Sequence, residues 1–165
     1  MSLNAIRLMQ YVHAARKRYL KTLNELPWDE IIKDRGASFP SIRDILLHSL
    51  DVEDRLINYV IASKAETWVS EDFGKFSTMS GIQQRIEEVE NKVEAYLAKL
   101  SKTELERKIT LPWRRDSPMM LMIEDVLVQV SIENISHLGE LIALMWQFDK
   151  QPPFLSWSAF LEQGS

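Results

Sequence analysis

Glu133 and His137 are the residues of this chain whose types and spacing point most directly to chemistry. They lie four positions apart in the long apolar segment 119–148, so in a helix both side chains project from one face, about 6 Å apart. The other residues of that face are apolar: Val126, Val130, Leu141 and Leu144. A carboxylate in such surroundings is costly unless it is paired, hydrogen-bonded or bound to a metal. The spacing therefore suggests that both side chains contribute to one metal site.

His48 is the candidate for a third ligand. It lies between Ile45 and Val52 on the inward side of a second amphipathic segment, 42–62. Two imidazoles and one carboxylate leave at least one coordination position open, which is typical of catalytic rather than structural metal sites. The set suits one divalent ion, with zinc, nickel, iron and manganese not distinguished. Such an ion would acidify a bound water or activate a substrate thiol.

A reading without metal is equally compatible with the spacing. Glu133 and His137 would then form an ion pair within their helix, and His48 would bond to Asp44 or Asp51 one turn away. The third histidine, His13, falls beside the basic residues of the first segment and is predicted to lie on the surface.

No residue stands out as a general acid or base, so the sequence predicts no catalytic side chain. Four polar residues are close enough in helical phase to orient the proposed ligands: Asp51, Gln129, Asn134 and Glu140.

The elements that must position these residues are four amphipathic helices, expected at about 3–26, 42–62, 80–100 and 119–148. Ser41 is predicted to cap the second helix, and Ser80 with Gln83 the third, while Asp116–Pro118 resembles the start of the fourth. A short extended piece is expected at 107–113 and a short C-terminal helix around 157–161. The pattern predicts an all-α four-helix bundle in a single domain, 1–165. The long connector 63–77 indicates at least one crossover.

The composition limits the function classes. With a net charge of −4 among 165 residues, the chain offers no overall basic field for nucleic acid. It has no cysteine, which excludes disulfides and cysteine-ligated zinc, and fits a cytoplasmic protein. No run reaches the roughly 18 apolar residues of a membrane span.

Two stretches resemble the sequence motifs of the DinB/YfiT-like proteins. Residues 36–53 (GASFPSIRDILLHSLDVE) are similar to the second-helix motif of that family. Residues 133–141 (ENISHLGEL) are similar to its fourth-helix motif, His-x-x-x-His-Arg-Gly-Gln-[Leu/Ile]. The resemblance extends over nearly the whole chain through the helix order, the aromatic loop and the closing Pro-Pro and Trp/Phe tail.

The resemblance implies an up-up-down-down bundle with a metal held by three histidines, often in a homodimer. His48 and His137 match two of the family's histidines, whereas Glu133 occupies the position of the third. Leu138 and Glu140 replace the usual Arg and Gln. The family includes enzymes that use low-molecular-weight thiols, among them a mycothiol-dependent maleylpyruvate isomerase, so a thiol is an expected cofactor and a small molecule the expected substrate.

Three hypotheses follow. The first is a metal-dependent enzyme in which His48, Glu133 and His137 hold the ion for thiol transfer or hydrolysis. The second is a non-enzymatic, dimeric stress-response or interaction bundle whose metal is structural. The third is a bundle that has lost its metal, since Glu133 departs from the family motif.

Overall fold

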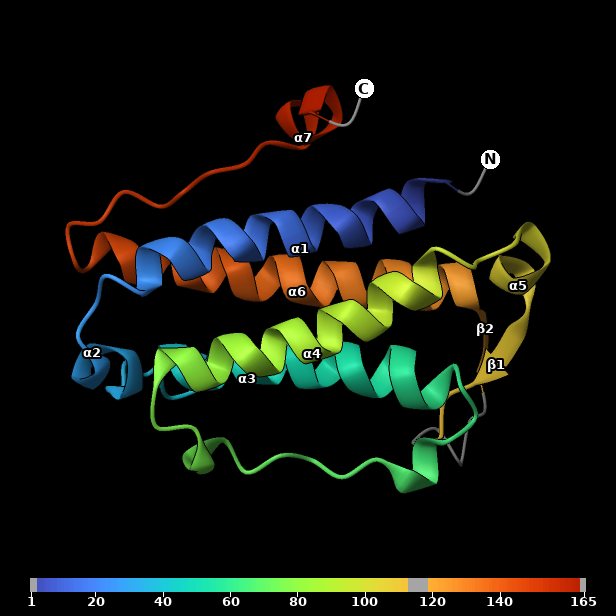
Figure 1. Ribbon diagram of the computed structural model, residues 1–165, viewed down its shortest axis with the longest axis horizontal. Coiled ribbons are helices and arrows are strands. Elements are labelled where there is room, and N and C mark those ends of the chain that lie inside the picture. Colours follow the sequence, from blue (N-terminus) through green and yellow to red (C-terminus); the bar gives the residue numbers. More distant parts are fainter. Residues whose placement is uncertain (1–2, 113–118, 164–165) are drawn as a thin grey trace.

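Four long helices form the bundle in the computed structural model, which describes residues 3–112 and 119–163 (Figure 1). The long helices are α1 (Leu3–Leu23), α3 (Ile42–Glu53), α4 (Met79–Leu97) and α6 (Ile123–Trp146). Three shorter helices accompany them: α2 (Trp28–Ile32), α5 (Lys102–Glu106) and α7 (Trp157–Gln163). The connector between α3 and α4 contains two 3₁₀ turns, Ala65–Thr67 and Phe73–Lys75. The all-α four-helix bundle predicted from the sequence is confirmed.

The directions of the helices differ from the expected up-up-down-down order. α1 and α6 run the same way, while α3 and α4 run together in the opposite direction (Figure 1). The contacts agree: Met9 and Arg16 of α1 meet Ser131 and Asn134 of α6 in ascending order. The order is therefore up-down-down-up. The connector 61–78 runs back along the length of the bundle, because α3 and α4 are parallel (Figure 1).

The second predicted helix, 42–62, begins where the sequence predicted. Its last residues are wound as a π-helix instead of an α-helix. Ser41 caps it, since its Oγ accepts a hydrogen bond from the backbone N–H of Asp44 at 3.2 Å. From Asp54 to Val60 the backbone winds as a π-helix, η1, so the α-helix ends at Glu53. π-Helical turns are rare and occur frequently at functional sites.

Two helix starts were predicted incorrectly. Thr78, rather than Ser80, caps α4, because the Thr78 Oγ1 accepts from the N–H of Gly81 at 3.1 Å. α6 begins at Ile123 instead of near residue 119, because Met120–Met122 forms strand β2. The proposed start signal at 116–118 lies outside the described residues.

Strand β2 pairs antiparallel with β1 (Lys108–Thr110), which confirms an extended piece in that region. Ile109 faces Leu121 in this pairing. The small hairpin lies at the end of the bundle where α6 begins (Figure 1).

The short C-terminal helix predicted around 157–161 is confirmed as α7, and it packs on α1. The Tyr11 hydroxyl donates to the carbonyl of Leu155 at 2.8 Å, and the Tyr11 ring meets Trp157 and Phe160 edge-on. Among the described residues, no helix is long and apolar enough to cross a membrane.

Candidate metal centre

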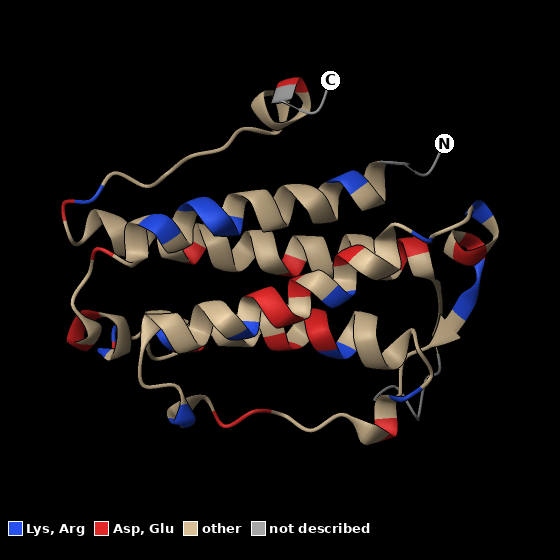
Figure 2. Cartoon of the chain, viewed as in Figure 1, with Lys and Arg blue, Asp and Glu red and all other residues tan. Residues whose placement is uncertain are grey.

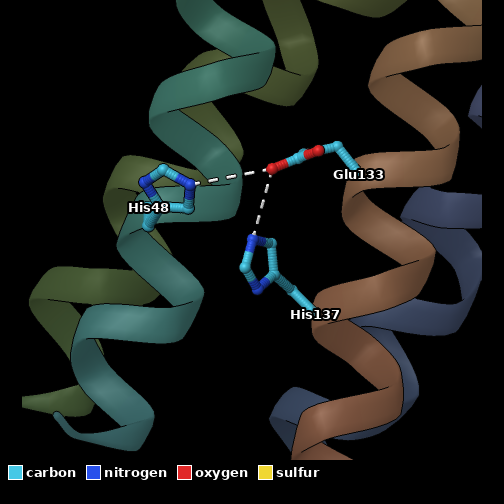
Figure 3. Close-up of side chains that lie close together, drawn as sticks. All are labelled: His48, Glu133 and His137. Carbon is cyan, nitrogen blue, oxygen red and sulfur yellow. Dashed lines mark ion pairs between the residues drawn. The ribbon is translucent and has the colours of Figure 1, made fainter. Parts of the chain in front are cut away.

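Helices α3 and α6 bring His48, Glu133 and His137 together between them (Figure 3). Glu133 Oε1 lies 3.9 Å from His48 Nε2 and 3.6 Å from His137 Nε2. One ligand atom from each residue lies within 4.8 Å of the other two. Donors at about 2.1 Å from one ion can be at most about 4.2 Å apart. Small side-chain rotations would therefore bring all three donors onto a single ion.

The orientation of His137 is set by Glu140, one turn further along α6. His137 Nδ1 lies 2.7 Å from Glu140 Oε2, and the Ser38 hydroxyl donates to that same oxygen at 2.7 Å. The backbone N–H of Ser38 also donates to Glu140, at 3.3 Å. A carboxylate on one imidazole nitrogen fixes the proton there and leaves the other nitrogen free to bind metal. Here the free nitrogen is Nε2, the atom that faces Glu133.

Phe39 supports both imidazoles. Its ring stacks on His48 with the centroids 3.9 Å apart and an interplanar angle of 24°. The same ring meets His137 edge-on at 5.8 Å. Ser38 and Phe39 thus fold the connector before α3 against the site.

The electrostatics favour the deprotonated forms that metals bind. Burial lowers the pKa of His48, and the neighbouring His137 lowers it further. Burial raises the pKa of Glu140, but the hydrogen bonds from Ser38 and His137 outweigh this effect and lower the pKa overall. A neutral imidazole at His48 and an ionised Glu140 are the states that a metal centre requires.

The site is open on one side. The side chains of His48 and Glu133 are 28% and 36% exposed, whereas that of His137 is 11% exposed. A cleft of about 710 Å³ adjoins Glu133. Its polar lining comes from α6, at intervals of four residues: Asp125, Gln129 and Glu133. Its other lining residues are apolar and come from α3, η1 and the hairpin region: Val52, Leu56, Leu111, Met119 and Leu121.

The four residues predicted to orient the ligands lie in different places. Glu140 bonds His137, and Gln129 lines the cleft beside Glu133. Asp51 instead accepts a hydrogen bond from Ser70 at 3.3 Å, and burial raises its pKa to about 6. Asn134 accepts a hydrogen bond from the buried Arg16 of α1, away from the three candidate ligands.

The metal-free alternative paired His48 with Asp44 or Asp51, and both carboxylates have other hydrogen-bond partners in the structure. Asp44 accepts hydrogen bonds from the Ser41 hydroxyl and from the Arg43 guanidinium. The carboxylate nearest to His48 among the ion pairs of the described chain is that of Glu133, on the other helix.

A second group of polar side chains, the buried cluster, joins α1, α3, α4 and α6. It includes His13, which was incorrectly predicted to lie on the surface. His13 is 8% exposed. Its Nε2 lies 2.7 Å from Glu53 Oε1, and its Nδ1 lies 2.7 Å from Glu94 Oε1. Arg16, one turn further along α1, is 1% exposed and donates to Glu53, Glu90 and Asn134, each at 2.6 Å.

The charges of this buried cluster stabilise one another. Burial lowers the pKa of His13, but its hydrogen bonds to Glu53 and Glu94 outweigh burial and raise that pKa to about 9. Burial raises the pKa of Glu53, but Arg16 and His13 outweigh burial and lower it to about 2. Figure 2 shows acidic residues gathered near the middle of α3 and α4, where this cluster lies.

Sequence reasoning missed the cluster because His13 and Arg16 carry the charge pattern of a solvated helix face. The one available signal was Glu53, a charged residue beside Val52 and close in phase to the inward side of its helix. Ser38 and Phe39 lie in a connector without periodicity, so nothing linked them to the site.

Comparison with known proteins agrees with the fold. A crystal structure of a DinB family member from Shewanella denitrificans superposes with a TM-score of 0.58 at 13% sequence identity. The match covers 98% of this chain and 89% of that one. No curated protein matches significantly. The model of the DinB family matches residues 1–163, and the chain therefore belongs to the DinB family.

Proposed function

We propose that this protein binds one divalent metal ion through His48, Glu133 and His137 and uses it to activate a thiol or a water for transfer or hydrolysis. The observation that carries the proposal is the pairing of His137 Nδ1 with Glu140. It directs Nε2 toward Glu133 and His48, as in metal centres whose histidines are oriented by carboxylates.

The donor set fits such an ion. Two imidazole nitrogens and one carboxylate oxygen are ligands that zinc, nickel, iron and manganese all accept. When bound, the ion would lower the pKa of a coordinated water or thiol and so supply a nucleophile near neutral pH. Glu140 and Phe39 would hold the imidazoles in place during the reaction.

The cleft beside Glu133 supports a catalytic site over a structural one, because a structural ion is normally enclosed by protein ligands. Its apolar walls, including Leu56 and Leu121, would bind the body of a small-molecule substrate. Its polar lining residues Asp125 and Gln129 would accept or donate hydrogen bonds along the substrate.

Elemental analysis of untagged protein tests the metal site. The purified wild-type protein is expected to contain close to one equivalent of a divalent metal, and His48→Ala much less, with both giving the same helical circular dichroism. Glu133→His restores the family motif and is expected to retain the metal. Equal, near-zero metal in the wild-type protein and His48→Ala would overturn the proposal. Metal in Glu133→His alone would instead indicate a site lost through the glutamate.

Chelation separates the catalytic hypothesis from a purely structural metal. For a catalytic site, removing the ion is expected to abolish turnover in a screen of low-molecular-weight thiols and small electrophiles, with a modest change in melting temperature. A large loss of melting temperature without any turnover in the screen would favour the non-enzymatic bundle.

Glu140→Ala is expected to weaken metal binding by roughly 10–100-fold, because His137 would lose the partner that fixes its proton. Glu140→Gln keeps a hydrogen-bond acceptor for His137, so its metal affinity should lie between those of the wild-type protein and Glu140→Ala. Competition with a chromophoric chelator measures these affinities, with Glu124→Ala on the same helix as the control. An unchanged affinity for Glu140→Ala would show that the contact has no role in binding.

A further inference from the structure

Helices α3 and α6, which supply the three candidate ligands, are joined by one buried guanidinium nitrogen of α1. Nη2 of Arg16 donates to Glu53 Oε2 on α3 and to Asn134 Oδ1 on α6, each at 2.6 Å. The two hydrogens of that nitrogen point about 120° apart, so the two acceptor oxygens lie about 4.5 Å from each other. All three side chains belong to residues that are at most 1% exposed. This bridge, Glu53–Arg16–Asn134, therefore fixes one point of α3 relative to one point of α6.

Both ends of the bridge are held by further contacts. The other oxygen of Glu53, Oε1, lies 2.7 Å from His13 Nε2, so α1 holds the whole carboxylate. The side-chain amide of Asn134 donates to the carbonyl of Val130 at 2.9 Å, one turn back along α6, which turns Oδ1 toward Arg16. Hydrogen bonds with ionised partners are shorter and stronger than neutral ones. The bridge is therefore a strong, directional link between the two helix backbones.

The bridge is close to the candidate ligands along both helices. Asn134 directly follows Glu133, and Glu53 lies five positions after His48, about 7.5 Å along α3. Neither side chain bonds a candidate ligand, since both are turned to Arg16 of α1. Their influence on the site is therefore transmitted by the backbones of α3 and α6.

Direct polar contact between α3 and α6 is slight. Within residues 3–112 and 119–163, the hydrogen bonds and ion pairs join these two helices only at His48 and Glu133, whose nearest atoms are 3.9 Å apart. The apolar core holds the helices together, but burial of apolar surface is not directional. The bridge supplies the directional contact that the core lacks.

The ligand set tolerates little separation of the two helices. Donors on one ion can be at most about 4.2 Å apart. His48 Nε2 already lies 3.9 Å from Glu133 Oε1, so a displacement of about 1 Å that separates α3 from α6 would carry this pair beyond the limit. Larger side-chain rotations would then be needed, against the stack of His48 on Phe39.

We propose that Arg16 is a positioning residue for the metal centre, because its bridge sets the separation of His48 from Glu133 and His137. The inference rests on the proposed function, since it concerns the same ion. It also gives the buried cluster a role besides stability, which is to hold α3 and α6 at the spacing that the metal requires.

Matched truncations of two acceptors of Arg16 test the proposal. Asn134→Ala removes the acceptor on α6, whereas Glu90→Ala removes the acceptor that Nη1 contacts on α4 at 2.6 Å and leaves the bridge intact. Cobalt(II) is the probe: competition with a chromophoric chelator measures its affinity, and its visible absorption bands report its coordination geometry. Asn134→Ala is expected to bind cobalt roughly 10-fold more weakly than the wild-type protein, with altered bands. Glu90→Ala should keep the wild-type affinity and bands.

Loss of stability alone does not produce this result. While the variants stay folded, which circular dichroism verifies, the apparent affinity falls only by the small unfolded fraction. Arg16→Met should weaken binding at least as much, and adding Asn134→Ala to it should cause no further loss, because both changes break the same bridge. Wild-type affinity and bands in Asn134→Ala, an equal loss in Glu90→Ala, or a further loss in the double variant would overturn the proposal.

A metal-free measurement separates this inference from the proposed function. Nitroxide labels at Arg43→Cys on α3 and Ala143→Cys on α6 give the distance between the two helices by electron paramagnetic resonance, since the chain has no other cysteine. The wild-type background and Glu90→Ala should share one narrow distance distribution, and Asn134→Ala should give a shifted or broader one. An unchanged distribution in Asn134→Ala would contradict the positioning role. If the wild-type protein bound no cobalt, the proposed metal site would be wrong, and the label distances would still decide whether Arg16 holds α3 and α6 together.

Discussion

Replacement of Arg16 by methionine is expected to lower the free energy of unfolding by about 3–5 kcal/mol. Arg16 is almost fully buried and donates to Glu53, Glu90 and Asn134. Glu53 is 0% exposed, so without the guanidinium its carboxylate would keep only His13 as a charged partner. Removing one member of a buried ion pair costs far more than removing a surface charge, because the remaining charge cannot be solvated.

Urea denaturation at pH 6 measures this loss. Arg7→Met removes an exposed arginine from the same helix and should change the free energy of unfolding by no more than about 0.5 kcal/mol. Adding Glu53→Gln to Arg16→Met should recover part of the loss, since the buried group is then neutral. A loss below about 1 kcal/mol for Arg16→Met would mean that the cluster contributes little to stability.

The stability of the metal-free protein is expected to fall by about 3 kcal/mol as the pH rises from 6.5 to 9. His13 has its pKa raised from 6.5 to about 9 in the folded state, so its stabilising effect is complete below 6.5 and is lost above 9. Glu53 has its pKa lowered from 4.5 to about 2, so its effect is present above 4.5 and is lost as the pH falls toward 2. Together these shifts predict a stability maximum between pH 4.5 and 6.5.

Urea midpoints at pH 5.5, 7.5 and 9 in the presence of a chelator test this dependence. His13→Gln should be less stable than the wild-type protein at pH 5.5. Its stability should change little between pH 5.5 and 9, because the titrating imidazole is gone. His137→Gln, with no metal bound, serves as the control and should keep the decline. If the wild-type protein were equally stable at pH 5.5 and 9, His13 would not be charged in the folded state.

Local patterns in the sequence were enough to predict the helices and the donor set. The periodicity of 42–62 and 119–148 predicted two of the long helices and the apolar faces that flank His48, Glu133 and His137. The spacing of Glu133 and His137 is a property of one helix, so their common direction followed without knowledge of the neighbours. The short strand before α6 was missed because its pairing with β1 overrides the helical pattern of 119–122.

The tertiary structure decided everything that depends on which helices are neighbours. Helical periodicity records which face of a helix is buried and not what covers it, so it did not give the up-down-down-up order, and it left the meeting of His48 with Glu133 and His137 of α6 as one of two alternatives. Ser38 contacts Glu140 across 102 positions of sequence, and His13 bonds Glu53 across 40. Such polar contacts produce no repeating pattern in the sequence, because each is a single contact between two distant segments. For that reason the sequence determined which residues this protein has available for chemistry, and the packing of its helices determined which of them act together.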